Sequence, residues 1–183
     1  MMINKRTLEA AETLRGWRKD PDRFVQNNFG VIPDKWQSKA LKAFVNEDPE
    51  QARICLLACA GVGKSACIAW CALLFISCYA GKGEHPKGAV VGATWDMLMD
   101  TLWPELNKWM QRSAYLKNKF TWTKSRIYAN DFPETWFLSA RSYSKSANEE
   151  EQGRTLSGLH SDYIAYFIDE SGDMSITVLK SAE

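Results

Sequence analysis

The N-terminal third of the chain shows apolar residues at helical spacing between polar ones. Residues 6–18 carry a stripe of this kind, which predicts an amphipathic helix. Asp20-Pro21 is a helix-start signal for a second, short helix, and Pro33-Asp34 opens a third. The apolar stripes of the first and third helices consist of Leu8, Ala11, Leu14 and Trp17, and of Trp36, Ala40, Leu41 and Phe44.

From residue 54 onward, short apolar runs alternate with long helical patterns. The runs at 54–58, 88–93, 135–138 and 163–168 predict buried strands, and 122–128 predicts a weaker, partly exposed one. Helices are predicted over 64–79, from Thr94 through Met110, and from about Ser175 onward. This alternation predicts an α/β fold, a mostly parallel sheet covered by helices on both faces.

The composition indicates the class of protein but no particular reaction. Apolar residues make up 45% and charged residues 25% of 183 residues, which is typical of one globular domain. The net charge of +1 gives no overall basic field. The apolar run 66–80 is shorter than the roughly 20 residues that cross a bilayer, and the charged N-terminus does not resemble a signal peptide.

Five cysteines occur without CxxC spacing, so we expect small buried hydrophobes in a reducing, cytoplasmic setting rather than zinc ligands or disulfides.

The strongest motif is Ala58-Cys59-Ala60-Gly61-Val62-Gly63-Lys64-Ser65, between a predicted strand and a predicted helix. Gly61, Val62 and Gly63 would turn backbone N–H groups toward phosphate oxygens. Lys64 is then expected to bind the β- and γ-phosphates of ATP, and Ser65 to bind Mg²⁺. The strict phosphate-loop pattern has glycine where Ala58 stands, so a simple strand-to-helix turn is the alternative.

A second motif, Asp169-Glu170, follows the apolar strand 163–168. In a parallel sheet, this strand and the phosphate loop end at the same edge. We therefore expect Asp169 to bind Mg²⁺ directly or through one of the other ligands of the metal, and Glu170 to activate the attacking water. A solvated turn is the alternative, because acidic residues commonly end strands.

Three further side chains are candidates for nucleotide chemistry. The Gln37 amide can both donate to and accept from an adenine edge, although an exposed glutamine at a helix start is the alternative. Arg141, at a strand end, and Arg154, in a polar loop, are candidates for the arginine that stabilises the γ-phosphate, or else are surface charges. His160 is interpreted as a structural loop residue.

The motifs together resemble those of the large subunit of tailed-phage terminases, the ATPases that drive double-stranded DNA into a procapsid. The resemblance runs from about residue 20 to the C-terminus, and its specificity lies in the pieces between the two shared ATPase motifs. The matching pieces are Trp36-Gln37, Gly61-Val62-Gly63-Lys64-Ser65, Gly92-Ala93-Thr94, Leu102-Trp103-Pro104-Glu105-Leu106, Trp136-Phe137-Leu138-Ser139-Ala140-Arg141, Leu156-Ser157-Gly158-Leu159-His160 and Ile168-Asp169-Glu170-Ser171.

This resemblance implies a three-layer P-loop ATPase core over 51–183, with residues 1–50 forming a helical lid beside the nucleotide. It implies ATP and Mg²⁺ as ligands, with Lys64 and Ser65 on the triphosphate and its metal and Gln37 on adenine. The implied partners are double-stranded DNA, the portal protein and the small terminase subunit, in the cytoplasm of a bacterial host. A homo-oligomeric ring of the full-length protein is also implied.

The chain departs from the terminase pattern in two respects. Family members often carry a basic residue or histidine where Ala60 stands. They also have a coupling strand and a nuclease domain after the acidic pair. In the family that strand lies between the glycine-loop strand and the acidic strand, so we expect a core that is incomplete at the C-terminus, with a gap in the middle of the sheet. A helicase-like translocase, and a truncated fragment that binds nucleotide without turnover, are the alternative functions.

Overall fold

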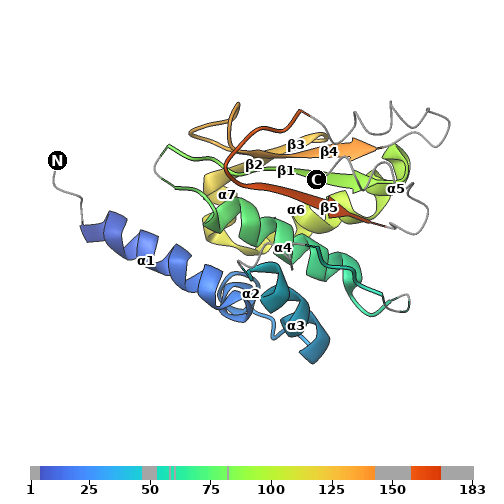
Figure 1. The fold of residues 1–183 in the computed structure, drawn as a ribbon, viewed down its shortest axis with the longest axis horizontal. Helices are drawn as coiled ribbons and strands as arrows, with labels where there is room; N and C mark the ends of the chain where they lie inside the picture. The colour runs from blue at the N-terminus through green and yellow to red at the C-terminus, as the bar shows by residue number, and fades with distance from the viewer. Residues whose placement is uncertain are drawn as a thin grey trace.

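The computed structural model describes residues 5–46, 53–57, 59, 61–81, 83–142 and 158–169. Within them the chain forms an α/β fold with one five-stranded mixed sheet. Figure 1 shows the sheet above a layer of helices, with α1 reaching beyond the body at the N-terminal end.

The three predicted N-terminal helices are confirmed as α1 (Lys5–Lys19), α2 (Pro21–Phe29) and α3 (Lys35–Phe44). The Asp20 carboxylate accepts from the backbone N–H of Arg23 at 3.2 Å, which caps α2. Gly30, at φ 68°, ends α2 in the left-handed conformation that glycine adopts without strain. These local signals explain why α2 begins where the sequence predicts it to begin and why it ends at Phe29.

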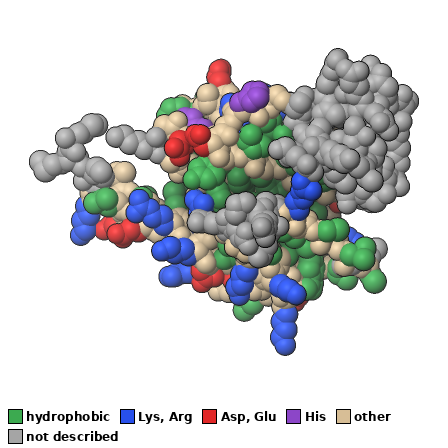
Figure 2. Space-filling model, in the orientation of Figure 1, with side chains coloured by type: hydrophobic (Ala, Val, Ile, Leu, Met, Phe, Trp, Pro, Cys, Tyr) green, Lys and Arg blue, Asp and Glu red, His purple; other side chains and the backbone are tan. Residues whose placement is uncertain are grey.

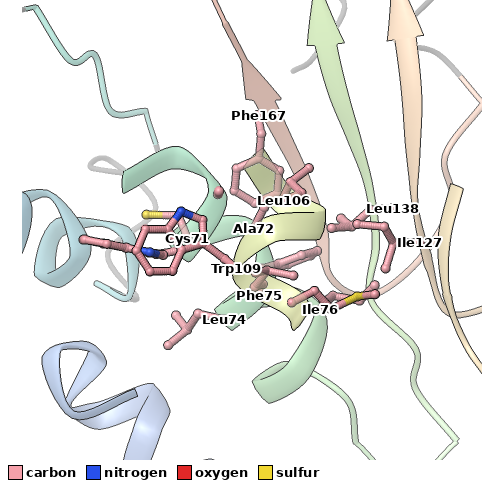
Figure 3. Close-up of a cluster of buried hydrophobic side chains, with 14 of the residues drawn as sticks. Cys71, Ala72, Leu74, Phe75, Ile76, Leu106, Trp109, Ile127, Leu138 and Phe167 are labelled. Atoms are coloured by element: carbon pink, nitrogen blue, oxygen red, sulfur yellow. The ribbon is translucent and has the colours of Figure 1, made fainter. Parts of the chain in front are cut away.

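Helix α4 (Lys64–Cys78) forms the centre of the hydrophobic core. It is apolar nearly all round because the sheet lies on one side and the N-terminal helices and α6 (Leu102–Arg112) lie on the others. Figure 3 shows side chains of α4, α6 and three strands meeting in this core. The labelled members are Cys71, Ala72, Leu74, Phe75, Ile76, Leu106, Trp109, Ile127, Leu138 and Phe167.

The sheet has the strand order β2-β3-β4-β1-β5. Its strands are β1 (Lys87–Gly92), β2 (Phe120–Trp122), β3 (Arg126–Ala129), β4 (Phe137–Ser142) and β5 (Ile164–Ile168). Strand β1 pairs in parallel with β4 and β5, whereas β3 pairs antiparallel with both β2 and β4. The predicted parallel core is present, but the weak strand 122–128 is replaced by an antiparallel hairpin, so the sheet is mixed rather than mostly parallel.

All helices of the described residues contribute to the apolar cluster on one face of the sheet. The other face carries a smaller cluster, in which Leu159 packs against the sheet residues Ala89, Val91 and Phe137. Two layers are therefore described, and the expected third layer would have to come from outside the described residues. The helix expected from Ser175 also lies outside them.

The helix predicted from Thr94 to Met110 is broken into α5 (Trp95–Asp100) and α6, followed by α7 (Ala114–Lys119). Thr94 caps α5 as expected, because its hydroxyl accepts from the backbone N–H of Met97 at 3.2 Å. At Thr101 the backbone leaves the helix, with φ −118° and ψ −89°. Pro104 explains the break, because it has no N–H to donate to the carbonyl of Asp100 and its ring crowds that carbonyl.

The predicted first strand does not form over the part that is described. Residues 53–57 are extended but belong to no strand, and the Leu57 side chain is 99% exposed. The outermost described strands are β2 and β5, and residues 53–57 pair with neither of them, whereas a strand forms only where a neighbouring edge satisfies its backbone groups. Of the strand, loop and helix expected around the phosphate loop, the described residues therefore form the loop and the helix but not the strand.

The structure bears on the predictions made for the cysteines and for a membrane span. Cys67, Cys71 and Cys78 are buried in α4 as small hydrophobes, and all five cysteines are free thiols. No helix within the described ranges is long and apolar enough to cross a membrane.

Candidate functional site

The glycine loop leads directly into the first turn of α4. Gly61 has φ 79° and Gly63 has φ 90°, a backbone region that residues with a Cβ rarely adopt. Gly63 is the N-cap residue of α4, and its carbonyl accepts from the backbone N–H of Cys67 at 3.1 Å. The positive end of a 15-residue helix therefore lies at this loop, an arrangement suited to an anion.

Lys64 and Ser65 are the first two residues of α4, as the motif predicts. The Lys64 ammonium donates to the backbone carbonyl of Cys59 at 3.1 Å, so the side chain curls back over the loop. This keeps the positive charge beside the N–H groups of the first turn. The Ser65 hydroxyl is partly exposed at the same turn.

Gln37 connects helix α3 to this loop. Its side-chain oxygen accepts from the backbone N–H of Asp34 at 2.9 Å in the capping box of α3. Its side-chain nitrogen donates to the carbonyl of Gly63 at 3.4 Å. With only 6% of Gln37 exposed, the residue is not the exposed helix-start glutamine that was the alternative. It lies beside the loop, and its role toward adenine remains a prediction.

Asp169 directly follows β5, as predicted. Its backbone N–H donates to the carbonyl of Val91 at 3.0 Å, which extends the β1–β5 ladder by one residue. The residue also lines a small hollow with Gly92, Met97 and Thr101, between the end of β1 and α5. The sheet thus fixes the position of the Asp169 backbone.

The two motifs lie at the same end of the molecule. Strands β1, β4 and β5 run toward the end at which α4 begins, and α4 runs back along the sheet in the opposite direction (Figure 1). This is the arrangement expected where the carboxyl ends of parallel strands meet a helix N-terminus. Lys64 and Asp169 are therefore on the same side of the fold.

Arg141 lies near the end of β4, at this same end of the sheet. Its Nε donates to the Ser139 hydroxyl at 3.2 Å, and partial burial lowers the pKa of the guanidinium from its ordinary value. Tyr166 of β5 acts in the opposite direction and raises the pKa of Arg141. The guanidinium remains charged at neutral pH, because the ordinary pKa is far above 7.

Other predicted site residues fall outside the described part of the chain. These are Glu170 and Arg154, together with the loop residues Ala58 and Ala60. The catalytic role of Glu170 and the γ-phosphate role of Arg154 therefore stay predictions. His160 is described in a loop, where its backbone carbonyl accepts from Lys87 Nζ at 2.9 Å, and the structural role of its imidazole stays a prediction.

Two features of the site were not anticipated from the sequence. The carbonyl of Cys59 holds the Lys64 side chain, and the Gln37 amide is shared between a helix cap and the loop. The proline–aspartate–glutamine spacing at residues 33–37 could have indicated the capping box, because glutamine is a frequent third residue of a helix that begins at aspartate. Nothing in the sequence indicated the bond to Gly63.

Among the described residues, no group of three or more His, Cys, Asp or Glu side chains could hold a metal ion. Ser65 and Asp169 nevertheless offer hard oxygen donors of the kind that Mg²⁺ prefers when phosphate oxygens supply its other ligands.

Known proteins were compared with the whole chain. No protein-family model matches it, and no curated protein aligns with it significantly.

Proposed function

We propose that this chain binds MgATP at the loop before α4 and forms the P-loop ATPase part of a viral DNA-packaging motor of the terminase type. The observation that carries the proposal is the position of Gly61, Gly63, Lys64 and Ser65 at the start of α4, at the sheet end where Asp169 follows β5. Packaging of double-stranded DNA rests in addition on the resemblance of the intervening motifs.

The chemistry follows from these groups. Backbone N–H groups of the loop and the first turn of α4 hold phosphate oxygens, and Lys64 exchanges the Cys59 carbonyl for the β- and γ-phosphates. Ser65 and Asp169 hold Mg²⁺, and Glu170 orients the attacking water. Arg141 and Arg154 are the candidate cations for the charge that develops on the γ-phosphate. The three-layer core with a helical lid belongs to this proposal.

Nucleotide binding is tested with a fluorescent ATP analogue and Mg²⁺ in equilibrium titrations of the chain. Lys64→Ala is expected to weaken binding at least tenfold, because a charge-assisted contact to phosphate is lost. Lys117→Ala is the matched control, since this exposed lysine lies on α7, away from the loop. If the two variants bind the analogue with equal affinity, the loop before α4 is not the nucleotide site.

A second candidate function is nucleotide binding without turnover. The observation that favours it is the position of residues 53–57, which do not join the sheet and leave Leu57 exposed. A loop that is anchored on its helix side alone holds phosphate less rigidly than one set between a strand and a helix. Phosphate release with Mg²⁺ and ATP separates the two functions: steady release that disappears in Lys64→Ala supports the ATPase, whereas binding without release supports the second function.

A further inference from the structure

The N-terminal helices carry a positive charge that the chain as a whole does not show. Residues 5–46 contain nine Lys or Arg and five Asp or Glu, a net charge of +4, whereas the complete chain has a net charge of +1. The rest of the chain is therefore acidic. Figure 2 shows Lys and Arg side chains gathered over α1, α2 and α3, in the lower half of the view.

The basic side chains follow the outward faces of these helices. On α3, Lys35, Lys39 and Lys42 are exposed at spacings of four and three residues, while Gln37 and Leu41 face the interior. On α1 and α2, the exposed basic residues are Arg15, Lys19 and Arg23. Arg18 is excluded from this surface, because its guanidinium stacks 4.1 Å from the centre of the Tyr79 ring.

The acidic residues of the same helices are largely engaged. Asp20 caps α2, Asp34 begins α3, and Asp22 pairs with Lys42 at 2.8 Å. Carboxylates at helix N-termini are partly neutralised by the helix dipole. Lys5 pairs with Glu9 and Lys42 with Asp22. Among the described side chains, no ion pair involves five exposed cations of these helices, which define the basic surface: Arg15, Lys19, Arg23, Lys35 and Lys39.

We infer that this basic surface binds the phosphate backbone of double-stranded DNA; the inference deepens the proposed function by naming where DNA lies. Duplex DNA is the polymer with the matching charge, with one negative charge per roughly 1.7 Å of axis.

The rest of the surface distinguishes the duplex from other anionic partners. Single strands bind through exposed aromatic rings, and the two tryptophans of α1 and α3, Trp17 and Trp36, are partly buried instead. An anionic membrane would require an apolar face in contact with lipid, but the apolar stripes of these helices pack inward and leave only Leu8 and Ile32 as large exposed hydrophobics in this segment.

The surface is also connected to the nucleotide site. Lys35 and Lys39 belong to α3, whose opposite side carries the Gln37 amide that contacts Gly63. DNA on the basic surface would therefore lie one helix away from the phosphate loop.

The test is fluorescence anisotropy of a labelled 20-base-pair duplex with the full chain, without nucleotide, between 50 and 200 mM NaCl. With about five phosphate contacts, the logarithm of the binding constant should fall with the logarithm of salt at a slope of about −4 to −5. Lys35→Gln/Lys39→Gln should reduce the magnitude of that slope by about 2. The quintuple glutamine variant of the basic surface should lose measurable binding at 200 mM NaCl.

The matched control is Lys117→Gln/Lys124→Gln, which removes the same charge from exposed lysines on α7 and in the β2–β3 turn. An equal effect of both double variants, or unchanged binding by the quintuple variant with a native circular dichroism spectrum, would overturn the inference. So would tighter binding to phosphatidylserine vesicles or to polyglutamate than to the duplex.

The same assay separates the inference from the proposed function. Lys64→Ala should bind the duplex as the unmodified chain does. Duplex binding that depends on the basic surface, in a chain that does not bind MgATP, would refute the proposed function and leave the inference standing.

Discussion

The side-chain amide of Gln37 donates to the backbone carbonyl of Gly63 at 3.4 Å, across 26 positions of sequence. This contact ties the first turn of α3 to the loop that begins α4. The same amide caps α3 through Asp34, so one buried side chain fixes both helix starts.

Removal of this amide should therefore affect both stability and binding. We expect Gln37→Ala to lower the free energy of unfolding by about 1–2 kcal/mol, since two backbone groups lose a buried partner. MgATP affinity should fall several-fold as the loop loses its anchor. Urea denaturation and nucleotide titration measure the two effects. Gln26→Ala, at an exposed position of α2, is the control and should change stability by less than about 0.5 kcal/mol.

Two glycines allow a matched test of loop geometry. Gly63→Ala should destabilise the protein by about 1–2 kcal/mol, because alanine is strained at φ 90° and its Cβ would lie 3.0 Å from Gln37 Nε2. It should also abolish MgATP binding. Gly16→Ala, inside α1 with no atom within 4 Å of the new Cβ, should instead stabilise the helix by about 0.5–1 kcal/mol. Thermal unfolding measures the stability of both variants. If the two substitutions shift stability in the same direction, the left-handed conformation of Gly63 is contradicted.

The exposed thiols provide an independent measure of nucleotide binding. Cys59 lies in the loop, where its carbonyl contacts Lys64, whereas Cys55 lies before the loop; both are exposed. Bound MgATP should slow alkylation of Cys59 more than alkylation of Cys55, because phosphates cover the loop. Mass spectrometry of labelled peptides gives both rates in one sample. Equal protection, or none in the presence of saturating nucleotide, would argue against a phosphate at this loop.

The buried thiol of Cys78 makes stability depend on alkaline pH. Burial raises its pKa from 9.0 to about 12, so the folded protein keeps the proton that the unfolded chain loses near pH 9. The contribution to stability is therefore complete below about pH 9 and declines as the pH rises toward 12. Denaturation at pH 8 and at pH 10 should show that the free energy of unfolding falls by less in Cys78→Ala than in the unmodified chain. Cys55→Ala, at an exposed position, should leave the loss unchanged.

Local signals account for the parts of the fold that the sequence predicted well. Asp20-Pro21 and Pro33-Asp34 begin helices through groups within one turn, and the apolar run before Ala93 is buried on both faces as predicted. The run before Asp169 forms β5, but of its residues only Phe167 is buried. Such features require no knowledge of distant residues. The helix break at Thr101 is also local, because Pro104 has no N–H with which to continue the helix.

The predictions that the structure contradicts concern strand pairing between segments that are distant in the sequence. An apolar run such as residues 54–57 favours a strand, but the strand forms only where a neighbouring edge receives it. The β2–β3 hairpin depends on its antiparallel register with β4, which periodicity does not encode. In the candidate site, the motifs placed Lys64 and Asp169 at one end of the sheet, whereas the hydrogen-bond partners of Lys64 and Gln37 depended on the folded loop.

Strand β5 has β1 on one side and, among the described strands, no neighbour on the other. Its outer row of peptide groups can serve as a template that an extended segment of another molecule copies. Light scattering of the purified chain over a range of concentrations shows whether a second copy pairs with this row. A short peptide that occupies this row would act as a solubilising agent, which makes β5 the natural place to graft a stabilising strand.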